Sequence, residues 1–235
     1  MRQYKYIILL LFLIINNRLN AQFNINWQQS YGGSEGEEAI GIVPFENGYL
    51  MAGSILSTDG QITCAETPGR SWLLNIDSNG DILGDFCYEN HGVSAFYQAV
   101  GANDLYLIGA SDLEQYNYET NIGVIKLDPN YNEIWRKGVG NYIGICYDNG
   151  GIVTNDGGVL AYAQICSGGG DVSQYYGPHF NAWLAKISAD GELQWDCTFG
   201  NSTGSSFIHG ITELSTGEYL AALYCDATGS GNGNV

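Results

Sequence analysis

The sequence predicts an all-β protein, a β-propeller-like array of four-stranded blades. One phrase, Trp72 to Gly80, returns with changes at residues 124–131 and again at residues 183–191. Within each repeat, short apolar or alternating runs are separated by turn residues, which is the pattern of β-strands. No stretch combines helical periodicity with capping residues. Repeats of this length with four strands each are typical of propeller blades, and a β-solenoid or a stacked sandwich is the structural alternative.

Four units can be superposed along the sequence. Their equivalent anchor positions are Trp27, Gly84, Trp135 and Trp195, at spacings of 57, 51 and 60 residues. The predicted units run over about residues 27–83, 84–134, 135–194 and 195–235, within a repeat domain of residues 22–235. We therefore expect three complete units and an incomplete fourth.

The first unit shows how its four strands, here lettered a to d, are recognised. Glu46-Asn47-Gly48 separates strand a from strand b, and Asn79-Gly80 joins strand c to strand d as a hairpin, because Asn and Gly tolerate positive φ. The expected strands are Ala39–Val43, Tyr49–Leu56, Ser71–Ile76 and Ile82–Tyr88. The same order of strands and turns is expected in each complete unit.

The fourth unit contains only two predicted strands, Phe207–Leu214 and Glu218–Cys225. The segment Asn24–Tyr31 aligns with a strand d, as if it completed the last blade of a ring, but no segment supplies strand c. The sequence thus predicts a piece of a longer propeller, truncated at its C-terminus. The alternative is an open array whose last unit leaves an unpaired edge.

Three motifs resemble a repeat of bacterial secreted proteins. They are Trp27-(3)-Tyr31-Gly32-Gly33-Ser34, Asn47-Gly48-Tyr49 and Trp72–Gly80. The family repeats W-x3-YGGS, DGGY and W-L-x-K-[LI]-D-x-x-G, and its members often carry a type IX secretion sorting domain. The resemblance covers residues 24–225 and implies a propeller-like fold and export, with no catalytic residues to carry over. This chain departs from the pattern because it has no sorting domain and its second unit lacks the YGG and the strand c Trp.

Residues 1–21 have the pattern of a secretory signal peptide. Arg2 and Lys5 form the charged start, Ile7–Ile15 the apolar run, and Leu19-Asn20-Ala21 the cleavage site. This apolar run is far short of the roughly 20 residues that cross a bilayer as a helix, which disfavours an uncleaved anchor. We expect a chain that is secreted or held at the cell surface of a bacterium, without membrane insertion.

The charge balance disfavours some partners. The full chain has 8 basic against 25 acidic residues, and removal of Arg2, Lys5 and Arg18 with the signal peptide leaves 5 against 25, a formal charge of −20. Such a surface repels phosphate backbones and anionic lipids. Nucleic acid is therefore not an expected partner, and solubility outside the cell is a sufficient explanation of the charge.

Six cysteines, all beyond the signal peptide, predict disulfides rather than a metal cluster. Their count is even, the chain carries an export signal, and no CxxC pair is present. Cys146 and Cys166 lie ten residues on either side of Asp156 in a predicted a–b turn, so they should face each other across the hairpin. The pairs Cys64–Cys87 and Cys197–Cys225 follow by elimination.

Oxygen-bearing side chains alternate in the c–d turns, as they do in loops that hold calcium. These positions are Asp77/Asn79/Asp81, Asp128/Asn130/Asn132 and Ser188/Asp190/Glu192. The turns lack the glycine and the distant glutamate of an EF-hand, and Asp and Asn also stabilise tight turns by bonding to their own backbone. We favour turn chemistry and expect no cofactor, with calcium at the first two turns as the alternative. The three histidines share no metal-ligand spacing.

The long loops between strands b and c are the best candidates for a binding surface, because loops on a rigid scaffold commonly carry function. In a propeller these loops open on the same face as the d–a connections, and here they hold an acidic and aromatic mixture suited to contact. The candidate ligand residues are Glu114, Tyr116, Tyr118, Tyr175, Tyr176 and His179 in the loops, with Glu37 and Glu38 from an acidic cluster near strand a.

These features predict a binding or interaction module with a polysaccharide or an extracellular protein as ligand. An exported carbohydrate-active enzyme is the alternative, and it would need two convergent carboxylates about 5–10 Å apart beside a pocket. A purely structural repeat is the third interpretation, favoured if the long loops form no shared concavity. No catalytic residue is assigned, since no G-x-S-x-G motif is present.

Overall fold

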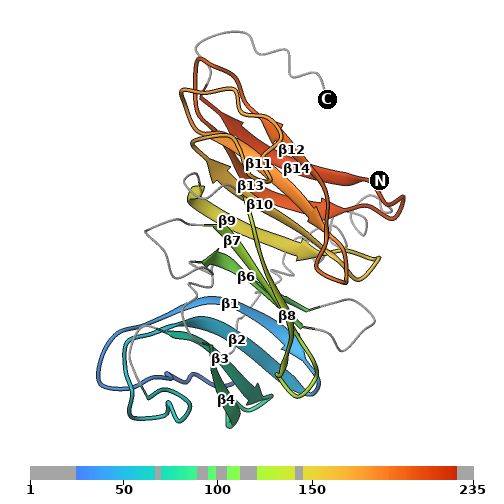
Figure 1. The fold of residues 1–235 in the computed structure, drawn as a ribbon. Coiled ribbons are helices and arrows are strands. Elements are labelled where there is room, and N and C mark those ends of the chain that lie inside the picture. Colours follow the sequence, from blue (N-terminus) through green and yellow to red (C-terminus); the bar gives the residue numbers. More distant parts are fainter. Residues whose placement is uncertain are drawn as a thin grey trace, which may run out of the picture.

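A computed structural model describes residues 25–66, 70–88, 95–98, 105–111, 121–140 and 145–226. Within these ranges the chain forms fourteen strands and no helix (Figure 1). Accordingly, none of the described residues belongs to a helix long and apolar enough to cross a bilayer. The predicted signal peptide, residues 1–21, lies outside the described residues.

The first sheet contains the four strands predicted for the first repeat, and its last strand extends into the second predicted unit, residues 84–134. It contains β1 (Glu37–Phe45), β2 (Gly48–Ile55), β3 (Arg70–Asp77) and β4 (Ile82–Tyr88). The strands pair in sequence order, each antiparallel to the next. All four overlap the predicted segments, and Gly80 in the hairpin between β3 and β4 has a φ of 88°, which favours glycine.

The other sheets repeat this pattern. The second sheet contains β5 (Ala95–Gln98), β6 (Leu105–Ser111), β7 (Asn121–Leu127) and β8 (Glu133–Val139). The third contains β9 (Ile145–Val153), β10 (Val159–Ile165), β11 (Asn181–Ile187) and β12 (Leu193–Phe199), and the fourth contains β13 (Ser206–Glu213) and β14 (Tyr219–Cys225). The predicted all-β class is confirmed, with three four-stranded sheets and one two-stranded sheet. The described sheets do not close into a barrel or a ring.

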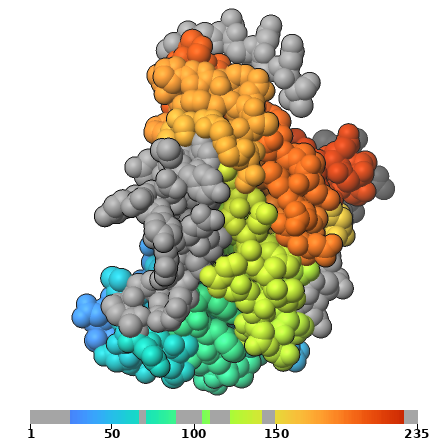
Figure 2. Space-filling view, in the orientation of Figure 1, coloured from blue at the N-terminus to red at the C-terminus, as the bar shows by residue number. Residues whose placement is uncertain are grey.

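The four sheets stack face to face in sequence order (Figure 1), and Figure 2 shows the same stack as a solid surface. Leu50 and Leu73 of the first sheet pack against Leu107 of the second. Leu160 of the third sheet packs against Ile208 of the fourth. Because successive side chains of a strand point to opposite faces, the inner strands of the stacked sheets present apolar residues to both neighbours.

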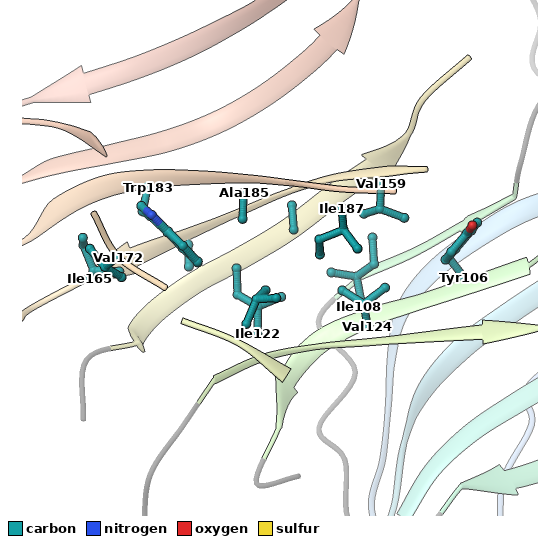
Figure 3. Packing of buried hydrophobic residues seen from close by; sticks show 13 residues of the cluster. Tyr106, Ile108, Ile122, Val124, Val159, Ile165, Val172, Trp183, Ala185 and Ile187 are labelled. Carbon is teal, nitrogen blue, oxygen red and sulfur yellow. The ribbon is translucent and has the colours of Figure 1, made fainter. Parts of the chain in front are cut away.

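The interface between the second and third sheets shows how this stacking is stabilised. Trp183 of β11 is fully buried there, near Ile122 of β7 and Ala185, while Val124 of β7 lies nearer Ile187 (Figure 3). The indole N–H of Trp183 donates to Asp196 Oδ2 at 2.9 Å, so its polar edge is satisfied. Burial of apolar surface, worth ~25 cal/mol per Å², is the main force between the sheets.

The anchor tryptophan of the repeat has a structural role. The indole N–H of Trp27 donates to the carbonyl of Ser78, in the c–d turn of the first sheet, at 2.9 Å. The ring lies against the turn glycine, since a Cβ added at Gly80 would come within 3.0 Å of it. Gly80 therefore serves twice: it adopts a positive φ and it leaves room for the indole.

The same contact joins the second sheet to the third. Trp135 of β8 donates its indole N–H to the carbonyl of Ala189 at 2.9 Å. A Cβ added at Gly191, whose φ is 86°, would come within 3.2 Å of that ring. The repeated phrase in the sequence thus encodes a contact between one unit and the hairpin of the next.

At the junction of the first and second sheets this pair is reversed. Gly84 occupies the anchor position on β4, and Tyr131 occupies the turn position with a φ of 64°. The Tyr131 ring lies 4.1 Å from that of Phe86 and 6.0 Å from that of Phe45, centroid to centroid. Its hydroxyl accepts a hydrogen bond from Asn75 Nδ2 at 2.8 Å. Here the large residue, Tyr131, is in the turn and the small residue, Gly84, is on the strand, the opposite of the Trp135–Gly191 contact.

One predicted disulfide is confirmed and another remains a prediction. Cys64 and Cys87 are bonded, which joins the b–c loop of the first sheet to β4. Cys166 is also in a disulfide. The Cys146 side chain lies outside the described part of the structure, so the pairing of Cys146 with Cys166 stays a prediction.

The third predicted disulfide, Cys197–Cys225, is wrong, because both residues are free thiols. Cys197 is on β12, the edge strand of the third sheet, whereas Cys225 ends β14, which pairs with β13 in the fourth sheet. The contacts between these two sheets run mainly through β13. Elimination failed because it assumed that all six cysteines pair.

Candidate ligand pocket

The candidate residues described by the structure lie at one end of the sheets. Glu37 pairs with Ile55, so the start of strand a lies beside the b–c loop that follows β2. Ser206 pairs with Cys225 in the same way in the fourth sheet. In the first sheet the start of strand a and the b–c loop therefore lie at the same end, and a common face for these loops in all units stays a prediction.

The structure describes only some of the candidate ligand residues in the long loops. Glu114, Tyr116 and Tyr118 lie outside the described residues, and Tyr175, Tyr176 and His179 lie in the b–c loop of the third sheet. The Tyr175 ring packs on the cluster between the second and third sheets, and its hydroxyl donates to the carbonyl of His179 at 3.1 Å, so its role is structural. Tyr176 and His179 are exposed and are free to contact a partner.

Glu37 and Glu38 line a pocket of about 270 Å³ on the outer face of the first sheet. The other face of this sheet packs against the second sheet. The remaining walls come from the segment before β1 and from β2 and β3, chiefly Gln29, Ser30, Tyr31, Met51 and Trp72. The volume lies near the lower end of the range for small-molecule sites.

The YGGS motif contributes Tyr31 to the pocket and is itself anchored by backbone hydrogen bonds. The backbone N–H groups of residues 32–35 donate in turn to Gln61 Oε1, Glu37 Oε2, Asp59 Oδ1 and Ser57 Oγ, at 2.8–3.2 Å. A side chain at Gly33 could not fit, since its Cβ would lie 2.4 Å from Asp59 Oδ1. This row of bonds fixes residues 29–31 against the sheet, where they contribute to the pocket.

Two aromatic rings in the pocket are held in place by hydrogen bonds. The Tyr31 hydroxyl donates to the carbonyl of Gly80 at 2.7 Å. Burial, with the nearby charges of Asp81 and Asp77, raises the pKa of Tyr31, so it stays protonated. The indole N–H of Trp72 donates to Asp85 Oδ2 at 3.2 Å. These rings are therefore positioned before any ligand arrives.

Asp85 also ties the b–c loop to the sheet. Besides Trp72, it accepts hydrogen bonds from the backbone N–H of Thr63 at 2.8 Å and of Cys64 at 3.2 Å. Burial would raise the pKa of Asp85, but these bonds outweigh it and lower the pKa. In the third sheet Asp196 is placed likewise, accepting from Trp183 and from the N–H of Ser173.

Three polar side chains of the pocket remain available to a ligand. Within the described residues, Gln29, Ser30 and Glu38 make no side-chain hydrogen bond or ion pair, and all three are exposed. Glu37 differs, because Oε2 accepts from Gly33 N–H at 3.2 Å and Oε1 from Ser57 N–H at 3.3 Å. The pocket thus offers one uncommitted carboxylate, one amide and one hydroxyl.

The two glutamates of the pocket differ in their hydrogen bonding. Cleavage of a glycosidic bond uses a pair of carboxyl groups, one of which transfers a proton while the other acts as base or nucleophile. Here Glu38 is free, but both oxygens of Glu37 are used to hold the pocket wall.

The candidate calcium turns are occupied by hydrogen bonds. Asp77 Oδ1 accepts from the N–H of Asn79 at 2.8 Å and of Asp81 at 2.9 Å, and Asp128 Oδ1 accepts in the same way from Asn130 and Asn132. These bonds lower the pKa of both aspartates. In the ranges that the structure describes, no three His, Cys, Asp or Glu residues are grouped to hold a metal ion. The favoured turn chemistry is present, and calcium binding stays a prediction.

Sequence reasoning found the two glutamates but missed the rest of the pocket. Tyr31 and Trp72 stood in the quoted repeat motifs, where they were interpreted as fold markers. Gln29 and Ser30 carry no motif of their own. The spacing Trp27-x3-Tyr31 was the available signal, because it lets both side chains donate hydrogen bonds to the first c–d hairpin.

No known protein family model matches this chain, and no curated protein sequence matches it significantly.

Proposed function

We propose that this chain is an exported binding module of β-propeller type whose pocket holds one residue of a neutral or amino-bearing polysaccharide. Tyr31 and Trp72 supply apolar ring surface suited to the C–H face of a sugar. Glu38 and Gln29 supply acceptors and donors for its hydroxyl groups. The observation that carries the proposal is the combination of two fixed rings with polar side chains that have no partner within the described residues.

Charge narrows the class of ligand. With 25 acidic residues against 5 basic ones after signal-peptide removal, the surface repels polyanions. Glu38 adds a negative charge inside the pocket. Neutral sugars and sugars with a free amino group therefore fit better than sulfated or uronic acid chains.

The propeller architecture and the location are part of the same proposal. The stacking of four-stranded antiparallel sheets in sequence order supports a propeller, with each unit attached to the next hairpin by the anchor contact. The pattern of residues 1–21 supports export. The extracellular polysaccharides of a bacterial surface would then be within reach.

A glycan array probed with the chain lacking residues 1–21 tests this function. We expect binding of neutral or amino-bearing glycans, weakened at least ten-fold in Glu38→Ala. The matched control is Glu35→Ala, an exposed neighbour that does not line the pocket, and it should bind as the wild type does. An array with no bound glycan, or equal loss in both variants, would contradict the proposal.

A further inference from the structure

Among the described strands, the fourth sheet ends at strand b, whereas the other sheets continue to strands c and d. In the first and third sheets, strand b pairs with strand a on one side and with strand c on the other, as β2 does with β1 and β3. Within the described residues β14 pairs only with β13. Leu223 and Tyr224 of β14 are 39% and 51% exposed. Such an edge can accept a further strand by backbone hydrogen bonding.

The third sheet presents the matching half of an anchor contact. Trp195 on β12 pairs with Lys186, as Trp135 on β8 pairs with Lys126, so the two indoles occupy equivalent positions. Trp135 donates its N–H to a carbonyl of the next c–d turn. Trp195 finds no such acceptor among the described residues. Its ring is 39% exposed and lies 5.9 Å from that of Tyr219.

We propose that this edge binds a β-hairpin of the same c–d repeat type, provided by a polypeptide segment outside the described residues. Strand c of the hairpin would pair with β14, and the carbonyl two residues before the left-handed turn position would accept the Trp195 N–H. A second copy of the chain is a poor donor, because its own described c–d hairpins already pair within their sheets.

The pairing of each anchor tryptophan with a turn glycine determines which hairpins this edge can accept. Wherever a tryptophan stands at the anchor position, the turn that it contacts has glycine, as in Trp27 with Gly80 and Trp135 with Gly191. Tyr131 stands in the turn that packs on β4, the strand with glycine at its anchor position. An incoming hairpin that meets Trp195 must therefore carry glycine at its turn, since a tyrosine there would occupy the volume of the indole.

The test uses the chain without residues 1–21 and a labelled peptide of residues 181–199 with Cys197→Ser. We expect saturable binding by fluorescence anisotropy. A peptide that also carries Gly191→Tyr should bind at least ten-fold more weakly. On the protein side, Trp195→Phe should weaken binding of the glycine peptide, whereas Trp27→Phe, at an anchor that already has its hairpin, should not.

Three results would overturn the inference. They are the absence of saturable binding by a folded chain, equal affinity for the glycine and tyrosine peptides, and equal effects of Trp195→Phe and Trp27→Phe. A dimeric mass by light scattering without peptide, together with no peptide binding, would instead assign the β14 edge to a second copy.

Discussion

A buried lysine shows how single residues hold one unit together. Lys186 of β11 has a side chain only 3% exposed, and its Nζ contacts both carboxylate oxygens of Asp156, at 2.9 and 3.0 Å. Asp156 lies in the a–b turn, where Gly157 has a φ of 79°. A Cβ on Gly158 would come within 2.6 Å of Nζ. The Asp-Gly-Gly turn is thus built around this ion pair.

Asp156→Asn should destabilise the fold at neutral pH. The substitution leaves a buried ammonium without its counter-charge, but Asp156 is about half exposed, so solvent screening keeps the expected cost to about 1–2 kcal/mol. Urea unfolding at pH 7 measures this cost. Glu192→Gln, on the exposed c–d turn of the same sheet, is the control and should change little.

The same pair predicts a dependence on acid. Burial opposes ionisation of Asp156, but hydrogen bonds from Thr154, Lys186 and Gly158 and the lysine charge lower its pKa to about 2. A carboxyl whose folded pKa is lowered stabilises the fold above its unfolded pKa of about 4 and loses that contribution as pH falls toward 2. Wild type and Asp156→Asn should therefore converge in stability over this window. A constant difference down to pH 2 would contradict the assignment.

At the scale of elements, the first and second sheets are each attached to the following one by a contact between strand d and the c–d turn of that next sheet. Trp135 packs on Gly191, whereas Tyr131, in the equivalent turn position, packs on Phe86 of the strand that carries Gly84. The sequence predicted both turns and all three strand d segments, because alternation and turn residues are local signals. The sequence could not predict that a large residue in a turn offsets a small one on a strand about 50 residues away. Gly84 therefore looked only like the loss of the anchor tryptophan.

A double-mutant cycle tests this compensation. Tyr131→Gly should cost about 1–3 kcal/mol, because a half-buried ring is lost while the strain of a non-glycine φ of 64° is relieved. Gly84→Trp should cost a similar amount by overpacking against Phe86 and the Tyr131 ring that packs on it. The combined variant should recover at least about 1 kcal/mol relative to the sum. Simple additivity in urea unfolding would show that the two positions are independent.

The disulfide between Cys64 and Cys87 connects two elements that the pocket needs. It closes a sequence separation of 23 residues, and its removal by Cys64→Ala with Cys87→Ala should cost about 3 kcal/mol. Cys225→Ala removes an exposed free thiol and should leave the unfolding midpoint unchanged. Equal midpoints for all three proteins would mean that the first disulfide adds no stability.

At the scale of the molecule, the stack of sheets was predictable and the pocket was not. Strands b and c are recognisable as short apolar runs between turn residues, and they are the buried inner strands of the sheets, as in β11 with every residue buried. The pocket depends on residues 29–31, which form no strand and are held by hydrogen bonds to a loop. Such a contact leaves no periodic trace in the sequence, so only the two glutamates were identified.

The pocket defines the function proposed for the whole molecule, and the indole N–H signals of its five tryptophans test it directly. A glycan that binds on the array is titrated into labelled protein while these signals are followed by NMR. We expect the Trp72 signal to shift in a saturable way, with Trp183, buried between the second and third sheets, unchanged. A titration in which the Trp72 signal does not shift, or in which only the Trp195 signal shifts, would contradict ligand binding in this pocket.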